Sequence, residues 1–220
     1  MGIFSARRVA AAAILAAISA LTPLTFAPPA EGAGTPSQND AIPVLPIVVS
    51  VAQVNGKPVR DDAWIDAQIA QAERLFGGIG IHLRKVKTQP LPDRFARLET
   101  RKDRDALAGE LTSGVINVMI VDSLRDVDDP KLFRMGVHWR PNADQKKHYV
   151  ILAANARESS LAHEIGHFFG NGHSNIENNV MSYKHTNEAL VFFDAAQAKK
   201  MRSFAGIYLR VKELVPLVVE

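Results

Sequence analysis

The sequence predicts an α+β fold built around a mixed, mostly parallel sheet of five strands. A strand, a helix and a second strand follow one another over 44–87, and this order favours a parallel pair joined by a crossover helix. The apolar run 114–121 (GVINVMIV) is typical of a central strand. With 220 residues, 47% of them hydrophobic, the chain has enough apolar material for one domain.

The first half of the folded region contains the strand, helix and strand. Residues 44–54 (VLPIVVSVAQV) are apolar at nearly every position, as expected of a strand covered on both faces. Apolar side chains recur at three- and four-residue spacing over 64–76, which predicts a helix that Gly77 and Gly78 end. The alternating segment 79–87 predicts a strand with one face in water.

The second half of the chain alternates short strands with helices. The expected elements are a short helix at 102–111, strands at 135–140 and 149–153, a strong helix at 159–169 and an amphipathic helix at 194–208. The turn-prone residues 141–144 (PNAD) separate the last two strands.

Composition excludes several classes of function. The chain has no cysteine, so a disulfide scaffold, a cysteine-ligated zinc site and a thiol nucleophile are all excluded. Any metal ion must be bound by His, Asp or Glu. The 26 Lys and Arg residues and 23 Asp and Glu residues are scattered along the chain, so no nucleic-acid partner is expected.

The N-terminus resembles a secretory signal. Arg7 and Arg8 precede an apolar run that is too short to span a bilayer comfortably. We therefore expect a signal peptide at 1–33, cleaved between about 27 and 34, and an exported protein, secreted or periplasmic, with no membrane attachment after cleavage. An uncleaved anchor or a buried helix is the alternative. Residues 34–46 read as a flexible leader or short pro-segment, before a folded domain at 44–220.

The segment 161–173 (LAHEIGHFFGNGH) carries the strongest chemical signal. His163 and His167 are four residues apart, so on a helix they share one face, as two ligands of one metal ion must. Gly170 can adopt positive φ and turn the chain back, which delivers His173. Three neutral imidazoles and one water form a tetrahedral zinc site with an open position, as in catalytic zinc centres. Glu164 lies beside this face, where a carboxylate can take a proton from water.

This pattern resembles a known family. The HExxHxxGxxH segment 163–173 is similar to the zinc-binding motif of the metzincins, and 179–183 (NVMSY) is similar to their Met-turn. Ser174 and the eight-residue step from His173 to Met181 resemble the matrixins, whereas Tyr183 resembles the arrangement in astacins and serralysins. The subfamily is left open.

The resemblance implies the metzincin fold and roles for individual residues. It makes His163, His167 and His173 the ligands of one catalytic zinc ion and Glu164 the general base. Peptide bonds would be hydrolysed by a zinc-bound water that the glutamate activates, which describes a zinc metalloendopeptidase acting on protein or peptide substrates. A monomer is expected.

Two further residues of this motif receive roles by the same resemblance. Met181 would form the floor of the site, which hardly differs from ordinary core packing. Tyr183 would ligate or overhang the zinc and stabilise the reaction oxyanion, with a plain packed tyrosine as the alternative.

The resemblance also divides the domain. An upper subdomain with two principal helices would extend to about 170, and a small lower subdomain would cover 171–220. Gly136, Val137 and His138 would belong to an antiparallel edge strand above the cleft, where an extended peptide adds as one more strand, and a plain sheet edge is the alternative.

A second metal ion is a separate possibility. His138 and His148, with Asp144 between them, invite a structural zinc site, although solvated histidines around a turn are commoner. No calcium loop of the EF-hand type is present. Calcium and a second zinc therefore remain open.

Two rival functions are considered. Glu188, 21 residues after His167, could be the third ligand of a thermolysin-like peptidase, but this leaves Gly170, His173 and Met181 unexplained. The other rival is a non-catalytic envelope or binding protein with a structural zinc, which would not need Glu164.

Overall fold

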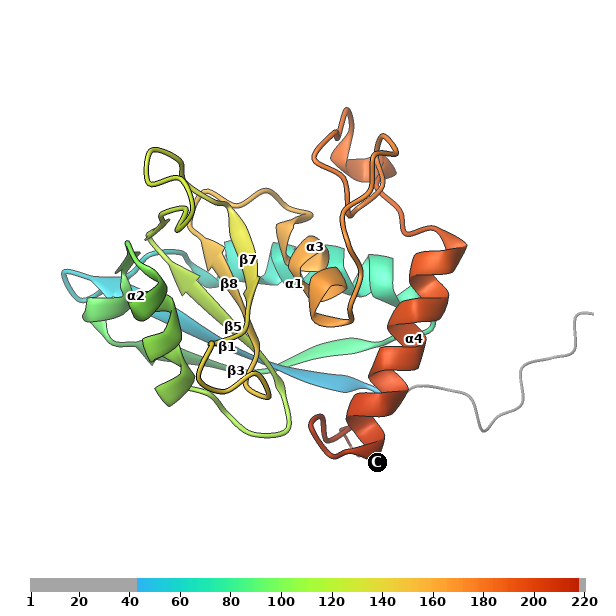
Figure 1. Cartoon of the computed structure of the whole chain (residues 1–220), viewed down its shortest axis with the longest axis horizontal. Helices are drawn as coiled ribbons and strands as arrows, with labels where there is room; N and C mark the ends of the chain where they lie inside the picture. The colour runs from blue at the N-terminus through green and yellow to red at the C-terminus, as the bar shows by residue number, and fades with distance from the viewer. Residues whose placement is uncertain (1–42, 218–220) are drawn as a thin grey trace, which may run out of the picture. The chain divides into compact units, whose positions relative to one another are not determined.

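A mixed sheet forms the centre of the fold (Figure 1). The computed structural model of the chain describes residues 43–217. Five principal strands lie in the order β3-β1-β5-β8-β7, and the two-residue β2 pairs with the end of β1. The pairs β3/β1, β1/β5 and β5/β8 are parallel, and β7/β8 is antiparallel. The strands are β1 (Leu45–Val54), β2 (Lys57–Pro58), β3 (Leu83–Leu91), β5 (Ile116–Val121), β7 (Gly136–Trp139) and β8 (Tyr149–Ala153). The α+β class and the mostly parallel sheet are therefore confirmed.

The crossover between β1 and β3 is helix α1 (Asp62–Gly77). It begins two residues before the apolar repeat at 64–76, because the Asp61 side chain accepts a hydrogen bond from the Trp64 amide and caps the helix. The strand that follows begins at Leu83 and not at 79. Ile79 and Ile81 both donate their amides to the Phe76 carbonyl, so these residues close the helix end before the strand starts.

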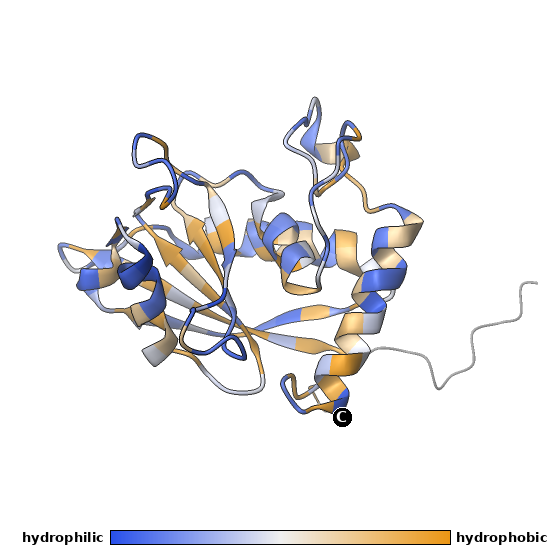
Figure 2. Ribbon diagram, in the orientation of Figure 1, coloured by the Kyte–Doolittle hydropathy of each residue, from blue (hydrophilic) through white to orange (hydrophobic). Residues whose placement is uncertain are grey.

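One face of the sheet packs against three helices. These are α1, α3 (Ser160–Phe168) and α4 (Ala195–Arg210), whose apolar residues share one core with the strands. That core includes Ile65, Phe76, Leu161, Ile165, Met201 and Ala205. Figure 2 shows the matching hydropathy, with apolar strands in the middle and polar loops around them.

The opposite face of the sheet has a smaller cover. It is formed by the 3-10 helix η2 (Asp93–Phe95), helix α2 (Arg101–Ala106), the 3-10 turn η3 (Leu107–Gly109) and the short pair β4 (Arg97–Leu98) and β6 (Ser123–Leu124). The predicted helix at 102–111 is thus shorter and ends in a 3-10 turn. Thr100 and Asp103 cap its start reciprocally.

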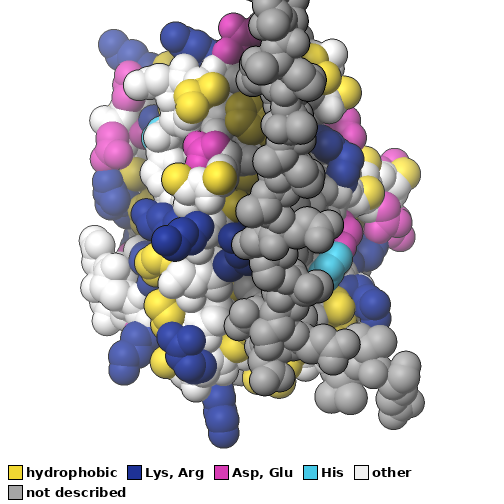
Figure 3. All heavy atoms as spheres, turned by 90° about the vertical axis from the view of Figure 1, so that its right-hand side faces the viewer, with side chains coloured by type: hydrophobic (Ala, Val, Ile, Leu, Met, Phe, Trp, Pro, Cys, Tyr) yellow, Lys and Arg dark blue, Asp and Glu magenta, His cyan; other side chains and the backbone are white. Residues whose placement is uncertain are grey.

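The segment after α3 lacks regular structure until α4. It contains only the 3-10 turn η4 (Glu188–Leu190) and isolated bridges such as Asn179 with Phe192. A capping box of Asp194 and Gln197 begins α4, one residue later than predicted. On the face seen in Figure 3, Lys and Arg side chains are interspersed with acidic and apolar ones.

The N-terminal predictions fall mainly outside the structure. The expected signal peptide at 1–33 and most of the leader at 34–46 lie outside the described residues, and Leu45 and Pro46 at the leader's end belong to β1. Within residues 43–217, none of the helices has the length and apolar character needed to cross a bilayer.

Candidate metal centre

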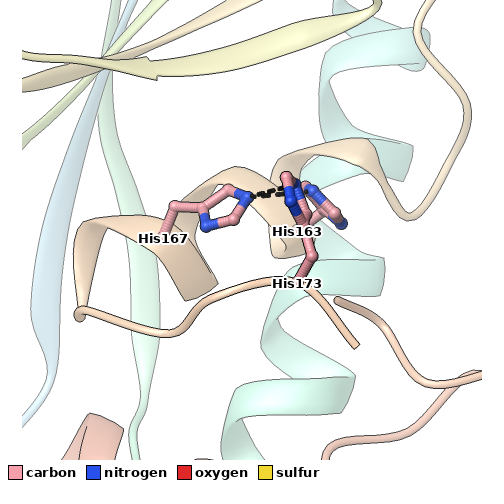
Figure 4. Close-up of side chains that lie close together, drawn as sticks. All are labelled: His163, His167 and His173. Carbon is pink, nitrogen blue, oxygen red and sulfur yellow. Dashed lines mark hydrogen bonds between the residues drawn. The ribbon is translucent and has the colours of Figure 1, made fainter. Parts of the chain in front are cut away.

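Three histidine rings converge at the C-terminal half of α3 (Figure 4). The Nε2 atom of His167 lies 3.1 Å from Nε2 of His163 and 3.1 Å from Nε2 of His173. His163 and His167 are on α3, and His173 comes from the loop that follows. The predicted ligand set is therefore assembled at one point.

The turn that delivers His173 depends on Gly170. Its φ of +83° is in the left-handed region, and a Cβ there would lie 2.9 Å from the Phe204 ring on α4. The Asn171 amide donates to the Gly166 carbonyl and closes the end of α3.

Hydrogen bonds on the far side of two rings determine where their protons lie. His163 Nδ1 is 2.7 Å from the Val180 carbonyl oxygen, and His167 Nδ1 is 2.8 Å from the Asn171 carbonyl oxygen. A carbonyl oxygen only accepts, so both Nδ1 atoms carry the proton and both Nε2 atoms expose a lone pair. The two lone pairs face one another at contact distance, and a cation between the rings would offset their repulsion.

The electrostatics and the spacing both suit zinc. Burial lowers the pKa of His163 to about 4 and also lowers the pKa of His167 and His173, so the rings are neutral at pH 7. Zn–N bonds of about 2.0–2.1 Å place tetrahedral ligand atoms about 3.3 Å apart. The observed spacing of 3.1 Å is close to this value.

Glu164 lies between the histidines and the edge strand β7. Its side chain is buried among apolar neighbours, and this burial raises the pKa of the carboxyl group to about 8. The His138 amide on β7 donates a hydrogen bond to the carboxylate, which partly opposes the rise. A Cβ at Gly136 would lie 2.8 Å from Glu164 Oε1, so only glycine leaves room for the carboxylate there.

Met181, which the sequence assigns to a Met-turn, packs against α3. Met181 is fully buried and its sulfur lies against Gly166 of α3, where a Cβ would collide with it. Its amide donates to Asn179 Oδ1 at 2.9 Å, and its carbonyl accepts from the Ser174 amide at 2.8 Å. The loop is thereby tied to the segment that holds His173.

Tyr183 reaches the histidine cluster from the solvent side. Its hydroxyl is 2.7 Å from Nε2 of His173, and its ring lies 4.6 Å from the His173 ring, centre to centre. The residue is 67% exposed, so it is not a packed core tyrosine. Its hydroxyl is therefore close enough to contact an ion or molecule bound between the three imidazoles.

The predicted edge strand is β7, which ends the sheet within the described residues. Trp139 is buried on the α2 side, and Val137 packs against the same cluster. Gly136 and His138 alternate with them and face α3. Together with the histidines they line a cleft of about 930 Å³.

The alternative ligand sets are not assembled. The Glu188 carboxylate lies 3.3 Å from His185 Nδ1, and Glu188 is not part of the three-histidine cluster. Of the residues considered for a second metal ion, Asp144 accepts a hydrogen bond from the Lys146 amide within its own turn and forms no metal-ligand cluster with His138 and His148 in the described part of the chain. His138 and His148 do meet, at 2.8 Å, but their acidic partner is Glu213.

Several residues of the site have no signal in the sequence. The backbone carbonyls of Val180 and Asn171 hold the ligand rings, and any residue type offers a carbonyl. Asn179 and Gln197 pair their amides across the Met-turn at 2.9 and 3.0 Å. Only the Asx-type position of Asn179 before the turn could have suggested such a role.

Comparison with known proteins identifies the fold. Mature mirolysin from Tannerella forsythia is 14% identical, with a TM-score of 0.54 over 78% of this chain and 98% of that chain. Archaemetzincin from Methanopyrus kandleri is 16% identical, with a TM-score of 0.50 over 78% of this chain and 99% of that chain. The chain has the metzincin fold.

Two further findings qualify this likeness. Metalloproteinase-II from Bacteroides fragilis is also similar in structure, at 14% identity and a TM-score of 0.51, over 74% of this chain and 53% of that chain. No protein-family model and no curated protein matches the chain. The metzincin fold is therefore shown by structure and by the placement of His163, His167 and His173, while the subfamily stays open.

Proposed function

We propose that the chain is an exported zinc-dependent endopeptidase of metzincin type. The observation that carries the proposal is the convergence of three histidine Nε2 atoms, with His167 Nε2 at 3.1 Å from each of the other two, beside a buried carboxylate, Glu164, under the edge strand β7. The similarity to mirolysin, solved with a cleaved peptide, supports a peptide substrate. His163, His167 and His173 would hold one zinc ion.

When bound, the zinc would polarise the scissile carbonyl and lower the pKa of a water molecule towards about 7. The protein's residues supply the rest of the chemistry. The Glu164 carboxylate takes the proton of the attacking water and then passes it to the leaving amine. Burial raises the pKa of this carboxyl group to about 8, and the positive charge of a bound zinc ion would lower it again, so that the carboxylate can accept a proton and later return it.

The remaining groups bind and orient the substrate. The free edge of β7 offers backbone donors and acceptors to an extended peptide, which would pair as an additional strand. The Tyr183 hydroxyl can donate a hydrogen bond to the carbonyl oxygen as negative charge develops on it. Met181 would support the histidines from below by filling space.

Export is proposed from the sequence alone. The basic pair Arg7-Arg8 and the apolar run after it favour a signal peptide at 1–33. N-terminal sequencing of protein recovered outside the cytoplasm would locate the cut. Full-length protein retained in the cytoplasm would contradict the proposal.

A peptidase screen tests the catalytic claim. Zinc-loaded wild type and Glu164→Gln are incubated with a mixture of denatured proteins, and new termini are identified by mass spectrometry. We expect cleavage by the wild type only, while both proteins retain one equivalent of zinc. Zinc binding by a folded wild type that cleaves nothing would favour the non-catalytic zinc protein instead.

A second comparison tests the ligand set. His173→Ala should lose zinc binding and activity, whereas Glu188→Ala should retain both, because Glu188 bonds to His185 and lies outside the cluster. The opposite result would support a thermolysin-like site.

A further inference from the structure

A chain of three polar side chains runs from the cleft into the protein. His138 on β7 contacts His148, whose Nδ1 lies 2.8 Å from His138 Nε2, and His148 Nε2 contacts the Glu213 carboxylate beyond α4. The His148 side chain is only 2% exposed and stacks on Phe168 at 3.9 Å. The proposed hydrolysis uses none of these side chains.

These three side chains, His138, His148 and Glu213, form a hydrogen-bond relay whose direction is determined by the carboxylate at its end. The Glu213 carboxylate can only accept, so His148 Nε2 carries the proton and donates. Burial lowers the pKa of His148, and it lowers the pKa of His138 to about 2, so both rings are neutral. His148 Nδ1 therefore accepts from His138 Nε2, and Nδ1 of His138 is left as an acceptor.

The residue that carries this acceptor lines the cleft. His138 is on the face of β7 that also presents Gly136 to Glu164, and its ring lies edge-on against Phe168 of α3. His138 lines the same cleft as His167. Its Nδ1 makes no hydrogen bond with any residue in the described part of the chain.

Arg140 is a hydrogen-bond donor on the same strand edge as His138. Arg140, two residues further along the same edge, also lines the cleft. Its guanidinium donates to the Gln145 carbonyl at 2.8 Å and to the Tyr208 hydroxyl at 3.3 Å, and it has no carboxylate partner within residues 43–217. His138 and Arg140 therefore both line the cleft, the first with a neutral ring that has a free acceptor and the second with a guanidinium that has no carboxylate within salt-bridge distance in residues 43–217.

We propose that His138 and Arg140 form a substrate subsite for a carboxamide side chain, that of Asn or Gln. The amide NH₂ would donate to His138 Nδ1, and the amide oxygen would accept from Arg140. An acidic side chain would bring a carboxylate oxygen against the His138 lone pair, and a basic side chain would face Arg140. His148 and Glu213 are positioning residues that hold the tautomer of His138.

The inference rests on the proposed peptidase, so its test uses binding as well as cleavage. Peptides with Gln, Leu or Glu at each position in turn are titrated against zinc-loaded Glu164→Gln, in which the proposed base is absent. We expect one position at which Gln binds three- to tenfold more tightly than Leu or Glu, as one or two net hydrogen bonds provide. Equal affinities, or a preference for Glu, would overturn the subsite.

Substitutions of His138 and Arg140 test whether these two residues cause the preference for Gln over Leu. His138→Phe keeps an aromatic ring but removes the acceptor, and Arg140→Met removes the donor. Each should reduce the preference for Gln over Leu to less than twofold without weakening the binding of the Leu peptide. The exposed His82, which bonds to Glu73 on α1, offers a control in His82→Phe that should keep the preference. A preference that survives both cleft variants would contradict the assignment.

The tautomer is checked independently. Nitrogen NMR of the wild type should show His138 Nδ1 unprotonated and Nε2 protonated, and Glu213→Leu should disturb this while leaving zinc binding intact. A proton on Nδ1 of His138 in the wild type would refute the relay. Cleavage in the peptidase screen without any preference for Gln or Asn would overturn this inference alone. Binding that depends on Gln in a protein that never cleaves would overturn only the proposed function.

Discussion

Substitution of Gly136 by alanine tests how tightly the edge strand positions the proposed base. A Cβ at this position would lie 2.8 Å from Oε1 and 2.9 Å from Cγ of Glu164, and 3.1 Å from Cδ2 of Leu152. Ordinary contact begins at 3.4 Å, so the carboxylate must move by about 0.6 Å or the strand must shift. Since a misplacement of about 1 Å costs roughly a hundredfold in rate, we expect kcat to fall ten- to a hundredfold.

The assay compares kcat and KM on one cleaved peptide with zinc affinity and thermal stability. Zinc affinity should change less than twofold, because the hydrogen bonds of His163 and His167 to Val180 and Asn171 are untouched. Gly109→Ala is the matched control, since a Cβ there meets nothing within 4 Å. Activity of Gly136→Ala within twofold of wild type, or a loss explained by lost zinc, would refute the reasoning.

Three other substitutions give separate tests. Gly170→Ala should lower the melting temperature and weaken zinc binding, because a left-handed backbone costs a non-glycine residue about 1–2 kcal/mol and the new methyl meets Phe204 at 2.9 Å; scanning fluorimetry with and without zinc would show an unchanged transition if this were wrong. Tyr183→Phe should lower kcat about 10²–10³-fold if the hydroxyl stabilises the oxyanion, with zinc binding intact, whereas wild-type kcat would leave it a spectator. Asp126, whose pKa is lowered first by hydrogen bonds from the Asp128 and Asp129 amides, contributes stability that is present above its unfolded pKa and lost as pH falls through the folded value. Asp126→Asn should therefore be less stable than the wild type at neutral pH, and the difference in their free energies of unfolding should shrink as the pH falls. A difference that stays the same at low pH would contradict this linkage.

The elements with strong local signals were predicted correctly. The motif 163–173 specifies a helix, a left-handed turn and a third histidine within eleven residues, so the convergence of the histidines could be predicted from this segment alone. The parallel pairing of β1 and β3 follows from chain order and crossover geometry. Both predictions depend on residues close together in the sequence.

Contacts between residues far apart in the sequence could not be predicted. Asp144 was considered beside His138 and His148 because it lies between them in the sequence, whereas the carboxylate that contacts His148 is that of Glu213, 65 residues away and just after α4. The contact between Gly136 and Glu164 depends on how β7 lies over α3. Neither the periodicity nor the composition of the sequence indicates how closely a strand packs against a helix.

The proposed catalytic centre has three imidazoles that hold one zinc ion and leave its fourth position open to water. X-ray absorption at the zinc edge of the loaded wild type tests this most directly. We predict three imidazole nitrogens at about 2.0–2.1 Å and one exchangeable oxygen ligand. Four protein ligands, or a coordination shell unchanged in His173→Ala, would contradict a catalytic centre of this kind.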